Sequence, residues 1–223
     1  VKLINNGQII VDSGATLSLS TNSVHSGGAS FSGAIVLSSG THSFADGFST
    51  SGVGLTDLQG GTLEVTSGTA RFGNMKVASL IQGSGNLSIA NAAINGGTMT
   101  GSGSTILASD GSHSMSGAYQ YLRGGRTLRN DGQLVVGSTT NDVKLYMDGS
   151  SGSIAKTRLV NQGDLVFQGA RSTSLLQGSG NPDAELENNG KLIKRDSGYA
   201  QINTRVSNTK QIVVDGGVLS LGG

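Results

Sequence analysis

The chain has 223 residues, including 37 glycines and one proline, and this balance without a three-residue period excludes collagen. Charged residues make up 13% of the chain and the formal net charge is +1, so the overall charge does not indicate a nucleic-acid partner. The absence of cysteine excludes zinc fingers, thiol catalysis and iron–sulfur clusters, and no apolar run reaches the roughly 18 residues of a transmembrane helix.

The apolar composition favours a narrow core. Hydrophobic residues are 35% of the chain and aromatic residues only 4%, so a thin core of Leu, Ile, Val and Ala is easier to fill than a wide one. Residues 1–110 hold three basic and five acidic residues, and residues 111–223 hold twelve and nine, so the two parts carry −2 and +3. This bias is too small to indicate a polyanionic partner.

The first expected strands are residues 9–11 and 15–19, on either side of a short turn. Apolar and polar residues alternate there with the period of two that indicates β-strands. Residues 20–57 are the least regular part of the chain, and short strands with looser turns are expected in them. His25 and His42 lie in this stretch without cysteine or paired carboxylates beside them, so they are predicted to be surface or turn histidines rather than metal ligands.

The alternation returns at residues 58–65, where Leu63 and Val65 are expected to point inward. The same pattern then repeats twice before residue 101. Ile106 and Met115 are the next residues expected to point inward. Short strands separated by glycine-rich turns are therefore predicted throughout the first half of the chain.

The clearest pattern is a phrase made of an apolar residue, a polar pair led by Asn, a Gly, one polar residue and a short apolar strand. Residues 159–167 and 186–194 both follow it. In the second half of the chain its corner positions are spaced 31, 27 and 20 residues apart, at Gly132, Gly163, Gly190 and Lys210. A period near 20–30 residues, imperfectly kept, indicates a solenoid.

Asn and Gly suit such corners because they enter the left-handed region of backbone conformation at the least cost. If successive coils stack, each corner Asn lies above the next one. We therefore expect the side-chain amides to hydrogen-bond to one another in a ladder.

The fold class follows from parallel strands without crossover helices. No long amphipathic helix is visible in the sequence, so parallel pairing requires the chain to wind around an axis. We predict an all-β, right-handed parallel β-helix, a single β-solenoid domain over residues 1–223, with roughly nine coils of about 20–30 residues and a length near 45 Å. The chain begins within a strand and ends within the repeat, so it is expected to be a piece of a longer repetitive protein. A β-sandwich is the alternative.

The repeated phrase resembles that of the β-helical exoproteins of Gram-negative bacteria, namely the filamentous-haemagglutinin-like two-partner-secretion proteins and autotransporter passenger domains. The phrases that carry the resemblance lie at Gly7, Gly61, Gly132, Gly163, Gly190 and Gly217. The resemblance implies an extracellular or cell-surface location and a role in adhesion. A translocator barrel and a secretion module are not recognisable here, so no binding residue of the family is assigned to this chain.

The densest group of chemically active side chains lies in residues 119–129. Tyr119, Tyr121 and Arg123 alternate onto one side of a strand, and Arg126 follows them. A flat aromatic face beside arginine donors is what a sugar or an acidic glycan requires, so these four residues form a candidate glycan-binding patch. The alternative is that the tyrosines only cover the side of the solenoid and the arginines only solvate it.

A second candidate is a small basic cluster formed by Lys191, Lys194 and Arg195. Arg171 and Lys210 are expected near it in neighbouring coils. Such a cluster could contact heparin-like chains or lipopolysaccharide, and the alternative is an ordinary solvated face.

Metal, cofactor and catalytic sites are not expected. Five carboxylates considered for calcium are scattered in the sequence and do not follow a calcium-binding spacing, namely Asp142, Asp148, Asp183, Glu185 and Glu187. His113 and Asp110 lie close together, but nothing marks either as a catalytic group. The glycine-rich turns lack the Gly-Lys-Ser/Thr and the following helix of a phosphate-binding loop.

The sequence therefore predicts a structural and adhesive segment of a bacterial surface or secreted protein. It is expected to project and present a binding surface to host or bacterial glycans or proteins, and to self-associate through its exposed ends. The competing reading is a carbohydrate-binding or carbohydrate-active β-helix, as in phage tail spikes and polysaccharide lyases.

Overall fold

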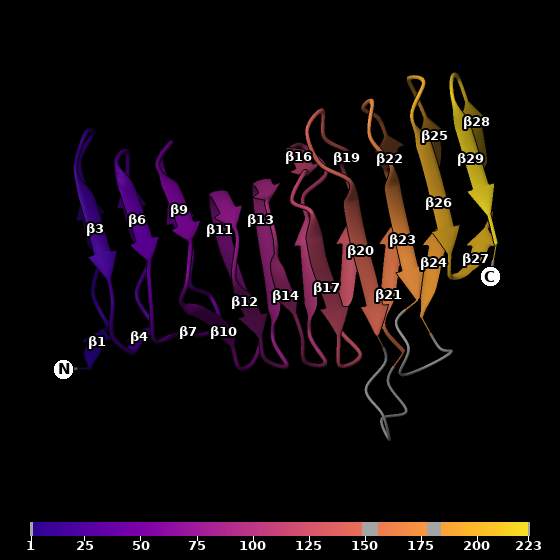
Figure 1. Cartoon of the computed structure of the whole chain (residues 1–223). Helices are drawn as coiled ribbons and strands as arrows, with labels where there is room; N and C mark the ends of the chain where they lie inside the picture. Colours follow the sequence, from indigo (N-terminus) through magenta and orange to yellow (C-terminus); the bar gives the residue numbers. More distant parts are fainter. Residues whose placement is uncertain (1, 149–155, 178–183, 223) are drawn as a thin grey trace.

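The computed structural model of the chain describes residues 2–148, 156–177 and 184–222. Every regular element in these ranges is a β-strand, and the strands stack into a parallel solenoid of about ten turns. The coils follow one another along a rod, with the beginning and the end of the chain at opposite ends (Figure 1). No helix that could cross a membrane occurs in the described ranges.

Each coil contributes strands to three faces. Face 1 is a sheet of eleven strands: β1 (Leu3–Asn5), β4 (Ser23–His25), β7 (Thr41–Phe44), β10 (Thr62–Val65), β12 (Leu80–Gln82), β14 (Gly97–Met99), β17 (Tyr119–Arg123), β20 (Val143–Asp148), β23 (Thr173–Gln177), β26 (Tyr199–Asn203) and β29 (Val218–Leu221). Face 2 holds β2 (Ile9–Val11), β5 (Ala29–Phe31), β8 (Thr50–Ser51), the first parts of β11 (Thr69–Val77) and β13 (Asn86–Ile94), β15 (Ser104–Leu107), β18 (Thr127–Asn130), β21 (Arg158–Asn161), β24 (Glu185–Asn188) and β27 (Arg205–Asn208). Face 3 holds β3 (Thr16–Leu19), β6 (Ala34–Leu37), β9 (Leu55–Leu58), the last parts of β11 and β13, β16 (Ser112–Met115), β19 (Gln133–Val136), β22 (Asp164–Phe167), β25 (Lys191–Lys194) and β28 (Gln211–Val214).

The strand pairing confirms the predicted fold class. Among the described residues every strand pair is parallel and joins one coil to the next, which rules out the β-sandwich. The number of residues between paired positions runs from 17, between Asn74 and Asn91, to 31, between Asn130 and Asn161. At about 4.8 Å for each coil, ten turns give a rod of roughly 48 Å.

The repeated phrase is found at all three corners of the coil, so counting phrases does not count coils. Gly132, Gly163 and Gly190 stand at the corner between faces 2 and 3. Gly7, however, lies between β1 and β2, at the corner of faces 1 and 2, and Gly61 lies between β9 and β10, at the corner of faces 3 and 1. The predicted spacings of 31, 27 and 20 residues hold because they were taken at one corner.

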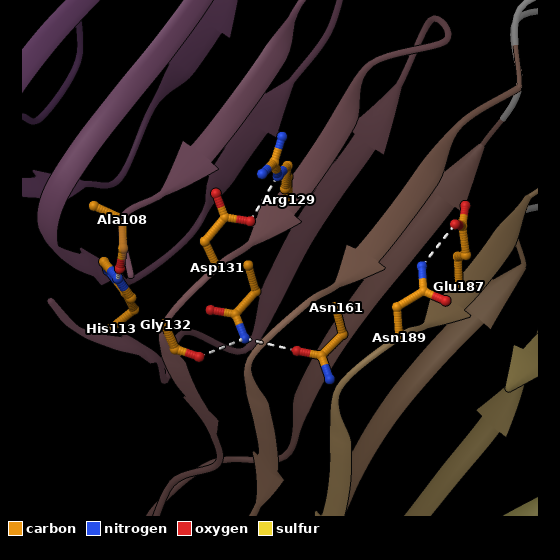
Figure 2. Close-up of polar contacts among 9 residues, drawn as sticks. Ala108, His113, Arg129, Asp131, Gly132, Asn161, Glu187 and Asn189 are labelled. Atoms are coloured by element: carbon orange, nitrogen blue, oxygen red, sulfur yellow. Dashed lines mark hydrogen bonds and ion pairs between the residues drawn. The ribbon is translucent and has the colours of Figure 1, made fainter. Parts of the chain in front are cut away.

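The predicted asparagine ladder is present at the corner of faces 2 and 3. The Nδ2 atom of Asn130 donates to Oδ1 of Asn161 at 2.8 Å, that of Asn161 to Asn188 at 2.7 Å, and that of Asn188 to Asn208 at 2.6 Å. Each Nδ2 also donates to the carbonyl oxygen two residues ahead, as Asn130 does to Gly132 at 3.2 Å (Figure 2). The ladder therefore fixes each tight corner and joins it to the next coil.

Residues on the outer side of the same corner are also paired. Arg129 Nε donates to the Asp131 carboxylate at 2.6 Å, and Asn189 Nδ2 donates to the Glu187 carboxylate at 2.8 Å (Figure 2). These contacts lie on the solvent side of the backbone, opposite to the buried amides. Each contact joins the last outward side chain of a face 2 strand to the first residue of the turn that follows.

The core is a narrow column of inward side chains. Leu63, Val65 and Met115 are buried as predicted, but Ile106 is not an inward residue. Its neighbours Thr105 and Leu107 have no exposed surface, whereas Ile106 is half-buried on the outside of β15. The prediction was wrong by one position because it assumed that the apolar residue, rather than the threonine, would face the core.

Residues 20–57 form coils that are as regular in pairing as the others. β4, β5, β6, β7, β8 and β9 all pair in register with neighbouring coils. The stretch looks irregular in sequence because several inward positions hold polar or aromatic side chains. Ser23, His25 and His42 have 1%, 1% and 0% of their surface exposed, so the prediction that the histidines lie at the surface was wrong.

Candidate functional site

The predicted tyrosine strand lies on the outside of face 1. In β17 the side chains of Gln120 and Leu122 are buried, and Tyr119, Tyr121 and Arg123 point outward between them. This alternation is the period of two that the sequence indicated. Three of the four residues of the predicted glycan patch are therefore on one surface.

The next coil doubles this surface. β20 pairs in register with β17, so Lys144 lies beside Tyr119, Tyr146 beside Tyr121, and Asp148 beside Arg123. We call these six residues the tyrosine surface. Sequence reasoning missed the three from β20, although the inward alternation of Val143, Leu145 and Met147 already implied that the residues between them point outward.

The three tyrosine rings of this surface are nearly parallel. The rings of Tyr121 and Tyr146 have centroids 5.4 Å apart and planes inclined by 17°, and those of Tyr119 and Tyr146 are 6.4 Å apart and inclined by 19°. Stacked aromatic pairs across neighbouring strands stabilise a sheet and hold the rings in place. The three rings therefore form a preformed stepped surface on the side of the rod, which we call the aromatic step.

Arg123 is held by two partners. Its Nε atom donates to Oδ2 of Asp148 at 2.8 Å, and its guanidinium carbon lies 4.2 Å from the centroid of the Tyr121 ring. The side chain of Arg123 is 45% exposed, so solvent screens this ion pair and it contributes little to the stability of the fold. The ion pair instead fixes the position of Arg123, because it keeps the guanidinium over the Tyr121 ring.

Arg126 is not part of the surface, contrary to the prediction. It has no exposed area and points into the solenoid at the corner of faces 1 and 2. Its guanidinium donates to Thr105 Oγ1 and to the carbonyl oxygens of Gly83, Thr100 and Ser104, at 2.9 to 3.2 Å. Burial lowers the pKa of Arg126 to about 10. Arg126 thus ties its own coil to two preceding coils and is unavailable to a glycan.

The three residues of the predicted basic cluster do not lie together in the structure. Lys191 begins β25 at the corner of faces 2 and 3, whereas Arg195 follows the other end of that strand. Lys194 is buried, with 1% of its surface exposed, and its ammonium group donates to the backbone carbonyls of Arg195 and Asp196. Burial lowers the pKa of Lys194, and Asp196 opposes this shift. These three residues therefore do not form one polyanion-binding patch.

The buried histidines near the beginning of the chain form a hydrogen-bonded chain. His42 Nε2 donates to the Ser39 carbonyl at 2.9 Å, so its Nδ1 accepts the Ser23 hydroxyl at 2.7 Å. Ser23 Oγ in turn accepts from His25 Nε2 at 2.7 Å. A serine between two histidines would suggest nucleophilic catalysis on a surface, but this one is enclosed in the core, where no substrate reaches it.

His113 has a structural role in the same way. It is 2% exposed, and its Nε2 donates to the Ala108 carbonyl at 2.9 Å (Figure 2). Its Nδ1 accepts the Ala92 amide at 3.3 Å. Burial lowers the pKa of His113, while the Ala108 contact and Asp110 raise it. Within the described ranges, no three His, Cys, Asp or Glu side chains gather as metal ligands would. Asp183, one of the scattered carboxylates considered for calcium, lies outside the described residues.

No family model, curated protein or solved structure matches the chain. The likeness to bacterial exoproteins therefore stays a prediction drawn from the repeated phrase.

Proposed function

We propose that this solenoid is a structural and adhesive segment of a bacterial cell-surface or secreted adhesin, and that its tyrosine surface binds carbohydrate. The observation that carries the proposal is the preformed step of Tyr119, Tyr121 and Tyr146 on the outside of a rigid rod, flanked by Arg123 and Lys144. Aromatic rings offer the apolar faces of sugars a large contact area, and their hydroxyl groups remain free to hydrogen-bond.

The rod itself supports the display part of the proposal. Almost all contacts between strands join one coil to the next, so the length of the solenoid can grow without a larger core. The tyrosine surface lies on β17 and β20, in the seventh and eighth coils along face 1. A binding surface in this position faces away from the axis of the rod and lies at a distance from both of its ends.

The proposed role is binding rather than catalysis. The competing carbohydrate-active reading would use two carboxylates flanking a glycosidic bond. The tyrosine surface has a single carboxylate, that of Asp148, and Arg123 engages it at 2.8 Å. We therefore expect that incubation with bacterial polysaccharides releases no new reducing ends, and a reducing-end assay above the blank would favour the enzyme.

The test of binding is a glycan array probed with a triple variant, Tyr119→Ala, Tyr121→Ala and Arg123→Ala. Its matched control carries Thr41→Ala, Ser43→Ala and Thr62→Ala, which change outward residues of the same face several coils away. The proposal predicts that the first variant loses all glycan signals and the control keeps them. Equal signals for both variants would remove the carbohydrate-binding role.

Self-association stays a separate prediction for the isolated polypeptide. The first and last coils leave inward apolar side chains partly exposed, including Leu3 at 38%, Val214 at 53% and Leu221 at 50%. Exposed strand edges of this kind pair with other chains. Sedimentation over a range of protein concentrations should show association, and a single monomer throughout the range would count against it.

A further inference from the structure

The two cations of the tyrosine surface are not equivalent. Arg123 is already paired with Asp148 and lies over Tyr121. Lys144 lies with its Nζ atom 5.8 Å from the centroid of the Tyr119 ring, and none of the described carboxylates is within ion-pair distance of it. Lys144 is therefore the cation of this surface whose charge is not offset by a described side chain.

The three tyrosines are not equivalent either. Tyr121 has Tyr146 on one side and the Arg123 guanidinium close to its ring, and both of these tyrosines are half-buried. Tyr119 is 53% exposed. It is the most open ring of the surface.

The preceding coil has a glycine directly alongside Tyr119. Gly97 pairs with Gln120, so the residue alongside Tyr119 is Gly96, which has no side chain. A Cβ atom built on Gly96 would meet only the carbonyl oxygen of Tyr119, at 3.7 Å. The position directly alongside Tyr119 in the preceding coil therefore carries no side chain.

From this asymmetry we infer that the tyrosine surface selects acidic sugars, with the apolar face of the sugar ring on Tyr119 and its anionic group on Lys144. The inference rests on the proposed carbohydrate-binding function and narrows it to one class of ligand. The anionic group is a carboxylate, as in uronic and sialic acids, or a sulfate. A lysine ammonium is a compact positive charge on a flexible stem, so it can form an ion pair with either a carboxylate or a sulfate. Arg123 acts as a positioning residue, because it holds Tyr121 and its charge is offset by Asp148.

The experiment uses the whole chain and pairs of immobilised oligosaccharides. Each acidic oligosaccharide is accompanied by its neutral counterpart, with the carboxylate reduced to an alcohol or the sulfate removed. The variants are Lys144→Met, which removes the charge and keeps the stem, and Lys144→Arg, which keeps the charge. Tyr119→Phe and Tyr119→Ala separate the ring from its hydroxyl. Lys76→Met is the control for net charge, because Lys76 is a partly exposed lysine on face 3, paired with Asp57 at 3.8 Å, whose loss changes the net charge equally.

We expect the wild-type chain to prefer the acidic member of a pair, and Lys144→Met to weaken acidic binding about fivefold, the loss of one partly exposed ion pair. Lys144→Arg and Lys76→Met should keep the preference. Tyr119→Ala should weaken binding of both members about tenfold, and Tyr119→Phe should retain most of it. A preference restricted to carboxylated or to sulfated sugars identifies the anion.

Two results would overturn the inference in distinguishable ways. Equal binding of acidic and neutral members, with loss in Tyr119→Ala, would refute the acidic selection and leave carbohydrate binding in place. An unchanged acidic preference in Lys144→Met would refute the role of Lys144 as the anion-binding residue and would also leave carbohydrate binding in place. Absence of binding to every oligosaccharide would refute both the inference and the proposed function. Unaltered circular dichroism and melting of the variants show that the fold is retained.

Discussion

Asn161 joins three successive coils through one buried side chain. Its Nδ2 atom donates to Asn188 Oδ1 and to the Lys191 carbonyl of the next coil, and to the Gly163 carbonyl of its own corner. Its Oδ1 atom accepts from Asn130 of the preceding coil. Since Asn130 and Asn188 also have no exposed surface, their side-chain amides would be left buried without this partner if the Asn161 amide were removed.

We predict that Asn161→Ala lowers the free energy of unfolding by about 2–4 kcal/mol, because it leaves several buried polar groups without partners. Gln162→Ala, at the adjacent exposed position, is the control and should change it by less than about 0.5 kcal/mol. Urea unfolding followed by circular dichroism measures both. Similar midpoints for the two variants would mean that the ladder does not stabilise the corner.

His25 is neutral in the folded chain for a physical reason. Burial, and secondly the proximity of His42, lower the pKa of His25 to about 4, and burial lowers that of His42 as well. The ring of His25 stacks on Phe44 with centroids 4.9 Å apart, and its Nδ1 atom has no hydrogen-bond partner among the described atoms. Thr56 Oγ1 is also unpartnered among the described atoms, and both residues line one small, mostly apolar cavity.

Because the folded pKa of His25 lies below the unfolded value near 6.5, the unfolded chain takes up the proton first as the pH falls. Stability is therefore complete above about pH 6.5 and declines towards pH 4. Between pH 7.5 and 4.5 we expect His25 to account for a loss of roughly 2–3 kcal/mol. Urea unfolding at both pH values should show a smaller pH effect in His25→Phe than in the wild-type chain, and equal effects would contradict the neutral, buried histidine.

The sequence predicted the asparagine ladder but not the buried polar residues. A repeated Asn at one corner has a local reason, since it must fit a tight turn in every coil. The burial of Arg126 depends on acceptors in other coils, such as the carbonyls of Gly83 and Thr100. Such partners come together only after the coils have stacked, and alternation alone does not locate them.

At the level of the element, glycines serve the corners in two different ways. A Cβ atom on Gly163 would lie 2.0 Å from the Gly132 carbonyl oxygen of the preceding coil, so this glycine allows two coils to approach. Gly14 has nothing within 4 Å of such an atom, but its φ of +78° is in the left-handed region. The first glycine is required by packing and the second by backbone conformation.

These two roles predict different substitution costs. Gly163→Ala should destabilise the solenoid by about 3 kcal/mol, because the backbone of two coils must separate. Gly14→Ala should cost about 1 kcal/mol of conformational strain, and Gly14→Asn less, since Asn tolerates the left-handed region. Thermal unfolding of the three variants provides the comparison. A cost at Gly14 equal to that at Gly163 would show that coil packing does not explain the corner glycines.

The strands of the tyrosine surface show how far an element can be predicted. Alternation in residues 119–123 correctly placed Tyr119, Tyr121 and Arg123 on one side. The pairing of Tyr121 with Tyr146 could not be predicted in the same way, because the connections between paired strands vary in length from coil to coil. The turn lengths set the register, and they are not constrained by the repeated phrase.

At the scale of the whole molecule, stability is a sum of contacts between neighbouring coils. Almost all strand contacts join one coil to the next, so a change in the first coils should leave the last coils intact. Hydrogen exchange at pH 4.5 and pH 7.5 should therefore reveal loss of protection around β4 and β7, next to His25, and not around β24 and β25. A uniform loss along the chain would indicate a single cooperative unit instead.

In-register stacking of one coil on the next underlies both the fold and the binding surface, and distances between spin labels test it most directly. The chain has no cysteine, so a pair of introduced cysteines is labelled specifically. Ser18 lies in one outward column with Ser114, Val135 and Val213, respectively five, six and nine coils away. Stacking predicts backbone separations of about 24, 29 and 43 Å, a constant step of about 4.8 Å whatever the length of chain between the labels. Separations that do not increase in proportion to the number of coils would contradict the solenoid and the binding surface built on it.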